Sequence, residues 1–149
     1  MRLTLYSDYA MRVLLHLAAY PDRSCSIADI AQRYAISHNH LMKVLAALAK
    51  AGYVTSARGR QGGYRLARDP SLISVGAVVR HTESGTEVVD CRNCVLCGAC
   101  GLSSALNEAM SAFFAVLDQY SLSDVANRSG ALSRLIAPLE PGGSPTSGE

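Results

Sequence analysis

Four cysteines in one short segment have the clearest capacity for chemistry in this sequence. Cys91, Cys94, Cys97 and Cys100 recur every third residue, and they are four of the five cysteines in the 149-residue chain. Thiolate sulfur is a soft donor that binds zinc or iron–sulfur clusters, and thiols this close together can curl around one centre. The pattern allows three interpretations: an iron–sulfur cluster, a zinc site, or a disulfide switch that forms on oxidation.

The spacing and the expected compartment favour the cluster. Repeated Cys-x2-Cys spacing is typical of bacterial ferredoxin segments, which favours a [4Fe-4S] over a [2Fe-2S] cluster. Structural zinc sites usually take two cysteine pairs on separate loops, and this chain has no second pair. No apolar run is long enough to span a membrane, and Asp8 and Arg12 interrupt the N-terminal segment where a signal peptide would be apolar. We therefore expect a cytoplasmic protein with reduced thiols and no membrane partner.

Three helices are expected in the first 52 residues. Apolar residues recur at helical spacing over residues 7–20, with Ser7 as the N-cap. A second, short helix begins at Ser26, and a third follows Ser37 and ends at Gly52. Two helices separated by a tight break are typical of a helix-turn-helix.

A basic hairpin follows the third helix. Residues 53–67 alternate in and out on either side of RGRQGG, which predicts two strands and a cationic tip, the wing of a winged helix-turn-helix. Residues 1–70 hold ten Lys and Arg against four Asp and Glu, a charge of +6, whereas residues 71–149 carry −4. The basic half is therefore expected to face double-stranded DNA. The candidate DNA-binding residues, in the third helix and the wing, are His38, Asn39, His40, Lys43, Arg58, Arg60, Gln61, Gly62, Gly63 and Arg65.

A long amphipathic helix is expected after the cysteines. Residues 74–83 predict a short helix, and apolar residues three or four apart predict a longer one from Leu102 to Tyr120. The stripe consists of Leu102, Leu106, Ala109, Phe113, Leu117 and Tyr120. A winged helix-turn-helix domain usually binds half of a pseudo-palindromic operator and works as a two-fold dimer, so we interpret the stripe as a homodimer interface. The alternative is that the stripe packs on the first helix.

The predicted fold is mainly α with a small β-hairpin: a winged helix-turn-helix domain plus a long dimerisation helix. We place the DNA-binding domain at 1–82 and the cysteine cluster-binding loop at 83–101. The dimerisation helix and a short C-terminal helix occupy 102–137, and a Pro-, Gly- and Ser-rich disordered tail occupies 138–149. The chain offers no nucleophile–base pair, phosphate loop or paired carboxylates, so it is not expected to be an enzyme.

Several segments together resemble one family of regulators: SDYAMRVLLHLA, HNHLMKVLAALAKAGYV, RGRQGGYRLAR, VVRHTE, CVLCGAC and FFAVLDQYSLSDV. Over residues 1–127 the chain resembles the winged-helix repressor family that includes the nitric-oxide sensor NsrR and the iron–sulfur biogenesis regulator IscR, and it is closest to the NsrR branch. The resemblance implies a homodimeric iron–sulfur transcription repressor that releases its operator on reaction with nitric oxide. It also implies three cysteine ligands, with Asp8 of the other subunit able to supply a fourth.

The cysteine loop departs from the family pattern. Cys94 and Cys100 keep the family's five-residue gap, but only two residues separate Cys91 from Cys94, where relatives usually have several more, and Cys97 is additional. The resemblance favours Cys91, Cys94 and Cys100 as ligands, with Cys97 as a rival to a neighbouring cysteine or to Asp8. Two alternatives remain open: an IscR-like regulator of iron–sulfur or redox status, and a zinc-stabilised winged-helix regulator.

Overall fold

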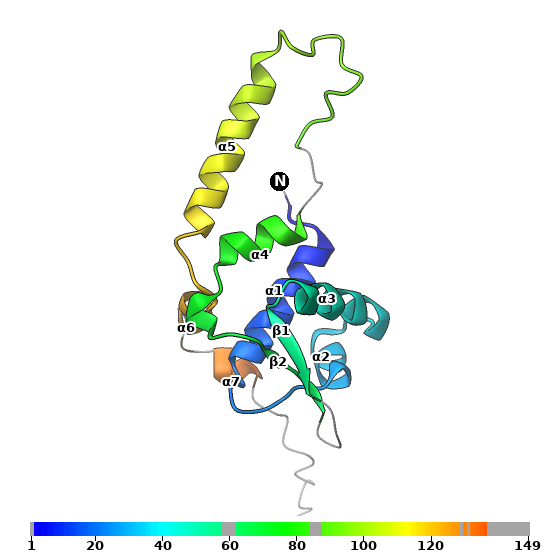
Figure 1. The fold of residues 1–149 in the computed structure, drawn as a ribbon, viewed down its shortest axis with the longest axis vertical. Coiled ribbons are helices and arrows are strands. Elements are labelled where there is room, and N and C mark those ends of the chain that lie inside the picture. The colour runs from blue at the N-terminus through cyan, green and yellow to red at the C-terminus, as the bar shows by residue number, and fades with distance from the viewer. Residues whose placement is uncertain (1, 58–61, 84–87, 129, 131, 137–149) are drawn as a thin grey trace, which may run out of the picture.

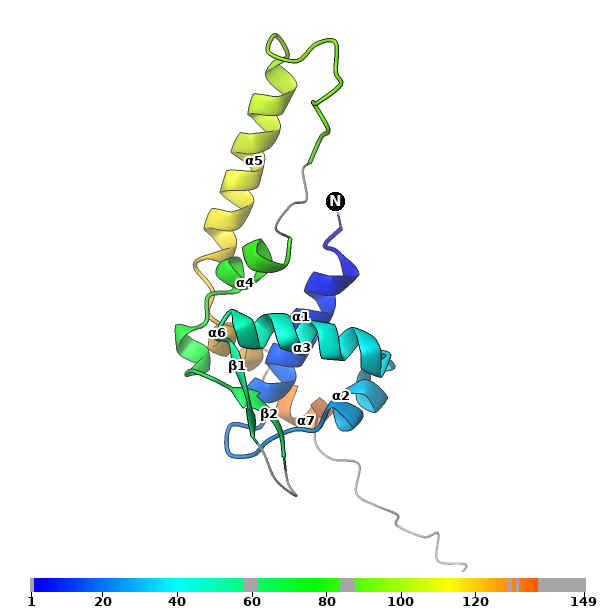
Figure 2. The same cartoon turned by 45° about the vertical axis from the view of Figure 1, so that its right-hand side comes forward.

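One long helix extends away from a mainly helical head, and the cysteine loop lies at its far end (Figures 1 and 2). The structure is a computed structural model that describes residues 2–57, 62–83, 88–128, 130 and 132–136. Its elements are α1 (Leu5–Ala18), α2 (Ile27–Tyr34), α3 (His38–Lys50), β1 (Val54–Ala57), β2 (Gly63–Leu66), the 3-10 helix η1 (Pro70–Leu72), α4 (Val75–Thr82), α5 (Gly101–Leu117), α6 (Leu122–Asn127) and α7 (Leu132–Ile136). This order confirms a mainly α fold with one small hairpin.

Helix α1 begins earlier than the sequence predicts. Its N-cap is Thr4, not Ser7, because Thr4 Oγ1 accepts a hydrogen bond of 3.2 Å from the Ser7 amide. Ser7 is buried in the first turn. The Thr4 amide and hydroxyl also donate to the Glu83 carboxylate, at 2.8 and 2.9 Å. This partner lies far along the chain, so local sequence could not distinguish the two possible caps.

The helix-turn-helix forms as predicted. The side chains of Ser26 and Ser37 cap α2 and α3 by accepting hydrogen bonds from amides three residues ahead. Between the helices, Ala35 takes a left-handed conformation with φ 51°, which reverses the chain sharply. Gly52, with φ 75°, follows α3 and ends it.

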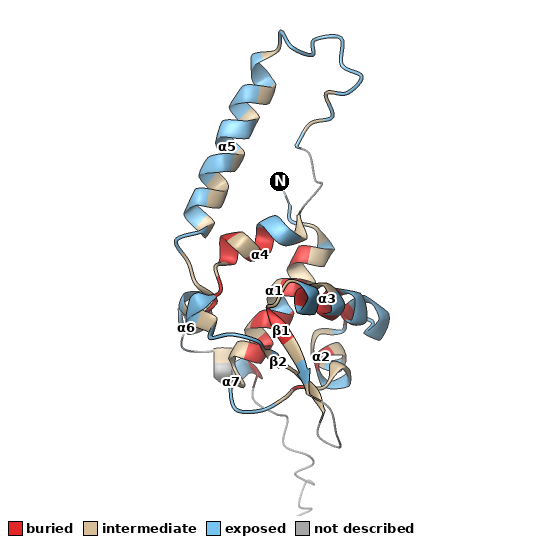
Figure 3. Ribbon diagram, viewed as in Figure 1, coloured by how far each residue is buried: buried red, intermediate tan, exposed pale blue. Residues whose placement is uncertain are grey.

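An aliphatic core packs α3 against α1 and α2, and its buried residues also come from α4 and β1 (Figure 3). Burial of one large aliphatic side chain in this core contributes roughly 1.5–3 kcal/mol of transfer free energy to the stability of the fold. The largest fully buried side chains are Leu14, Leu17, Ile30, Leu41, Leu45, Leu48, Ile73 and Leu122. Helix α3 is therefore held in place by its buried inner face.

Of the C-terminal elements, α5 forms an arm that extends from the head, whereas α6 packs on the head (Figure 1). No residue of α5 is buried. The helix ends three residues before the predicted Tyr120, whose carbonyl accepts a hydrogen bond of 3.0 Å from the Val75 amide. Helix α6 then packs on the head through the buried Leu122 and carries a capping box between Ser121 and Asp124. Neither η1 nor α7 was expected, and the predicted tail lies outside the described residues.

None of the helices in the described ranges is long and apolar enough to cross a membrane.

Candidate nucleic-acid interface and metal centre

The first half of α3 presents a polar, exposed surface. His38, Asn39, His40 and Lys43 are all exposed, whereas Leu41 and its neighbours on the inner face are buried. The amide dipoles of α3 place partial positive charge at the same end of the helix. This end is therefore suited to phosphates and to base edges in a major groove.

The wing is partly described. Strands β1 and β2 pair antiparallel, and Arg65 lies exposed opposite Thr55. Arg58, Arg60 and Gln61 at the predicted tip lie outside the described residues, and Gly62 precedes β2.

Gly63 has a packing role that the sequence did not reveal. The Cys25 backbone pairs with the adjacent Tyr64, with N–O distances of 2.9 and 2.8 Å. A Cβ atom at Gly63 would lie 2.5 Å from the Cys25 carbonyl oxygen. Glycine is therefore required where β2 passes this segment, whether or not Gly63 also approaches DNA.

Exchanging Arg65 or Lys43 for glutamine is expected to weaken DNA binding at all sequences. Each change removes about one phosphate-neutralising charge, so the slope of log K against log salt should fall by about 1. Fluorescence anisotropy on an operator duplex selected from genomic fragments measures that slope. The matched control is Arg128→Gln, which removes a cation that stacks on Tyr120 beside α6; an unchanged slope in both interface variants would refute this interface.

The cysteine loop curls through successive turns. The Cys94 amide donates to the Cys91 carbonyl at 3.3 Å, and the Cys97 amide donates to the Cys94 carbonyl at 3.0 Å. Cys94 and Cys97 are exposed, and Cys91 and Cys100 are half-buried. Gly98, with φ 86°, reverses the chain before Cys100, the N-cap of α5.

The donor set of this loop fits a cationic, thiolate-bound centre. Partial burial raises the pKa of Cys91, and the neighbouring Cys94, Cys97 and Cys100 thiols and Asp90 raise it further. The negative charge of the ionised sulfurs is thus mutually unfavourable until a metal neutralises it. Among the described residues no three His, Cys, Asp or Glu side chains are already gathered around one ion position, so binding requires the loop to close around its ligand.

Asp8 is not in contact with the cysteine loop of its own chain through any hydrogen bond or ion pair of the described residues. It is in the first turn of α1 and forms an ion pair of 2.9 Å with Arg12, one helical turn on. Its side chain is 39% exposed. The carboxylate is therefore accessible to another molecule.

Comparison with known proteins identifies the family. Residues 3–128 match the Rrf2 profile, described as an iron-dependent transcriptional regulator. The chain belongs to the Rrf2 family. It is 46% identical over 143 residues to the HTH-type transcriptional regulator NsrR of Bacillus licheniformis, covering 92% of this chain and 100% of the relative. It is also 46% identical over 146 residues to NsrR of Bacillus subtilis, covering 94% and 100%.

A solved Rrf2-type structure has the same fold. IscR of T. potens aligns with a TM-score of 0.72 and 28% identity over 87% of this chain and 88% of that one. The resemblance to NsrR and IscR is therefore confirmed, and this Rrf2 chain is a DNA-binding transcriptional repressor, not an enzyme.

Two segments flank the cysteine loop and are called its stems: the end of α4 with Glu83, and α5. The first stem is hydrogen-bonded to α1. Glu83 begins the loop and binds the Thr4 cap, and the Ser7 hydroxyl donates to Thr82 Oγ1 at 2.7 Å. Two residues beyond Ser7, the Tyr9 ring lies 6.2 Å from the His40 ring of α3, between centroids. Glu83 at the base of the loop, α1, which carries Asp8, and α3 are therefore in contact with one another in sequence.

The second stem is α5, and it joins the head through α4. The Asp118 carboxylate accepts hydrogen bonds from the Arg80 guanidinium, which also stacks 4.8 Å from the Phe114 ring centre. Asp118 reaches this position because a Cβ on Gly76 would lie 2.1 Å from its Oδ1. Sequence reasoning missed this joint, as it missed the Thr4–Glu83 contact, because no local motif marks either one.

Proposed function

We propose that this Rrf2 chain is a homodimeric repressor that holds an iron–sulfur cluster in its cysteine loop and releases its operator in the presence of nitric oxide. One observation carries the proposal: the segments on both sides of the four-cysteine loop are hydrogen-bonded to the head, through Thr4–Glu83 before the loop and through Arg80–Asp118 at the far end of α5. A change in the conformation of this loop is therefore transmitted to the head through these contacts.

The cysteines have distinct proposed roles. Cys91, Cys94 and Cys100 hold the cluster, and Cys97 stands as a competing fourth thiolate. When bound, the cluster supplies thiolate-ligated iron that reacts with nitric oxide. The assignment is supported by the three-residue spacing of the four cysteines and by the similarity to NsrR proteins.

Asp8 has the proposed role of joining two subunits. Its accessible carboxylate reaches the loop of the partner, so that each cluster site is completed by the other chain. Loss of that contact frees the heads to change their relative orientation. Two recognition helices must lie about 34 Å apart to enter successive major grooves, so a small reorientation costs much of the specific affinity.

Anaerobic purification tests the cofactor, and titration tests the signal. We expect a coloured protein with iron and acid-labile sulfide, whose operator affinity, followed by anisotropy, falls on addition of nitric oxide. A colourless protein that contains zinc would contradict the cluster and support a structural zinc site. A cluster-loaded protein that responds to iron or redox status and not to nitric oxide would instead support the IscR-like alternative.

A further inference from the structure

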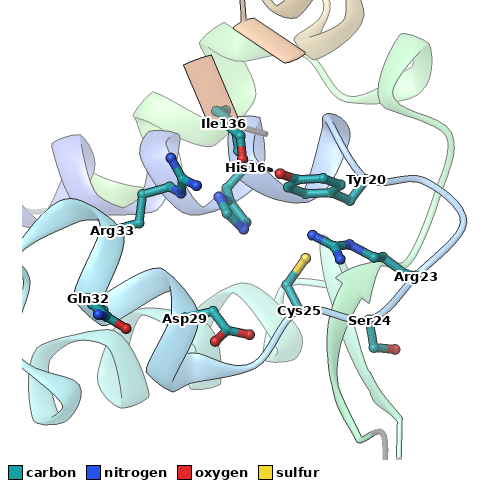
Figure 4. Close-up of a pocket in the computed structure, with 9 residues that line it drawn as sticks. All are labelled: His16, Tyr20, Arg23, Ser24, Cys25, Asp29, Gln32, Arg33 and Ile136. Atoms are coloured by element: carbon teal, nitrogen blue, oxygen red, sulfur yellow. Dashed lines mark hydrogen bonds between the residues drawn. The ribbon is translucent and has the colours of Figure 1, made fainter. Parts of the chain in front are cut away.

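A polar pocket of about 640 Å³ lies on the head between α1, α2 and α7 (Figure 4). This volume is typical of small-molecule sites. The buried His16 and Cys25 form its floor, and Arg23, Asp29 and Arg33 form part of its rim. None of the cysteine-loop or α3 residues assigned above lines it. The proposed repressor function therefore leaves this pocket without a role.

His16 places a hydrogen-bond donor in the pocket. The residue is only 4% exposed, and its Nδ1 lies 3.2 Å from the Tyr34 hydroxyl. Burial raises the pKa of Tyr34, so the phenol stays protonated and donates to Nδ1, which leaves the ring proton on Nε2.

The Nε2 atom is accessible from the pocket. Within the described residues Nε2 has no hydrogen-bond partner, yet they contain no buried side-chain nitrogen or oxygen without one. Nε2 is therefore accessible, and Figure 4 shows the ring directed from α1 into the pocket.

The charges around the floor favour an anion. The pKa of His16 is lowered to about 4 by burial first, then by Arg33 and Arg23, and Asp29 opposes this only as the smallest effect. The imidazole is thus neutral near pH 7 in a positive local potential. Arg33 lines the same pocket, and its Nη1 donates to the Leu135 carbonyl of α7 at 3.0 Å. A carboxylate here would meet two guanidinium groups and the Nε2–H donor.

The opposite charge is also present. The Asp29 carboxylate lines the same pocket from the first turn of α2 and makes no hydrogen bond or ion pair with any described side chain. It is available to an ammonium group. Cys25 and Ile136 add a small apolar surface for a short side chain.

We propose that this pocket binds a free α-amino acid. The carboxylate lies among His16, Arg23 and Arg33, and the ammonium group lies on Asp29. Because the Cys25 backbone pairs with Tyr64 of β2, a bound ligand braces the root of the wing. We expect occupation to tighten operator binding about fivefold.

Thermal unfolding of the full-length, cluster-loaded protein tests the site. The common L-amino acids are added one at a time, with lactate as the analogue without an ammonium group and ethanolamine as the analogue without a carboxylate. At about 100 times its Kd, at least one amino acid should raise Tm by roughly 5 °C or more. The histidine NMR signal of His16 should titrate at higher pH in that complex. Failure of every amino acid, or an equal shift with lactate, overturns the proposal.

Surface variants separate binding from folding. Arg23→Gln and Asp29→Asn should each remove the Tm shift, whereas Asp22→Asn, an exposed neighbour that does not line the pocket, should retain it. A shift that persists in Asp29→Asn refutes the ammonium contact. Operator affinity that stays constant in the presence of the bound amino acid refutes the link to the wing.

Discussion

Cys94→Ser and Cys100→Ser are each expected to lose iron and to lower operator affinity by at least about 100-fold, because specific sites are bound roughly 10³–10⁷ times more tightly than non-specific DNA. Serine cannot supply the soft thiolate that iron requires. Without the cluster the loop no longer fixes its two stems. The measurements are iron and sulfide content per chain and anisotropy on the operator duplex, both without oxygen.

Cys97→Ser is the matched control within the same loop. Cys97 is exposed like Cys94 and lies one turn further along, but it is the competing fourth thiolate and not one of the three cysteines proposed to hold the cluster. We expect this variant to keep its iron and its operator affinity. Loss of iron in Cys97→Ser together with retention in Cys91→Ser would exchange the roles of these two residues. Full operator affinity in iron-free Cys94→Ser would contradict the link between loop and head.

Local sequence determined the helix-turn-helix. The caps at Ser26 and Ser37 depend only on amides three residues away, and the exposed and buried faces of α3 follow from helical periodicity. These features were predicted correctly for that reason. The choice of Thr4 over Ser7 depended instead on Glu83, 79 residues away, and was predicted wrongly.

Distant contacts determined the ends of the arm and the joint beneath it. The sequence pattern continues to Tyr120, but a bridge between Ser74 and Ser121 draws the chain out of the helix after Leu117. The Arg80–Asp118 pair joins residues 38 apart. Periodicity and motif spacing carry no information on such pairs. The cysteine positions were visible in the sequence, whereas the connections that would make them a sensor were not.

The apolar stripe of α5 lies beside the face of the helix that contacts α4. At 3.6 residues per turn, Leu106 and Leu117 lie within about 40° of Phe113 around the helix. Phe114, which the Arg80 guanidinium covers, lies about 100° from Phe113. The stripe is therefore centred to one side of the Arg80 contact, and its members Leu106, Phe113 and Leu117 are half-buried in the single chain. No residue of α5 is buried in the single chain, which supports a second copy of the chain as the partner of this face.

Phe113→Glu is expected to convert the proposed dimer into a monomer and to lower operator affinity by at least about 10³-fold, because a monomer contacts only one half-site. A carboxylate in an apolar interface is left without a partner and costs several kcal/mol. Light scattering after size exclusion reports the mass, and anisotropy reports the affinity. The matched control is Ser104→Glu: this exposed position lies nine residues earlier, about half a turn around the helix, and should remain dimeric. Far-UV circular dichroism should be unchanged in both variants, since neither side chain is buried in the single chain. A Phe113→Glu protein that stays dimeric would place the subunit interface elsewhere and remove the support for a cluster site shared through Asp8.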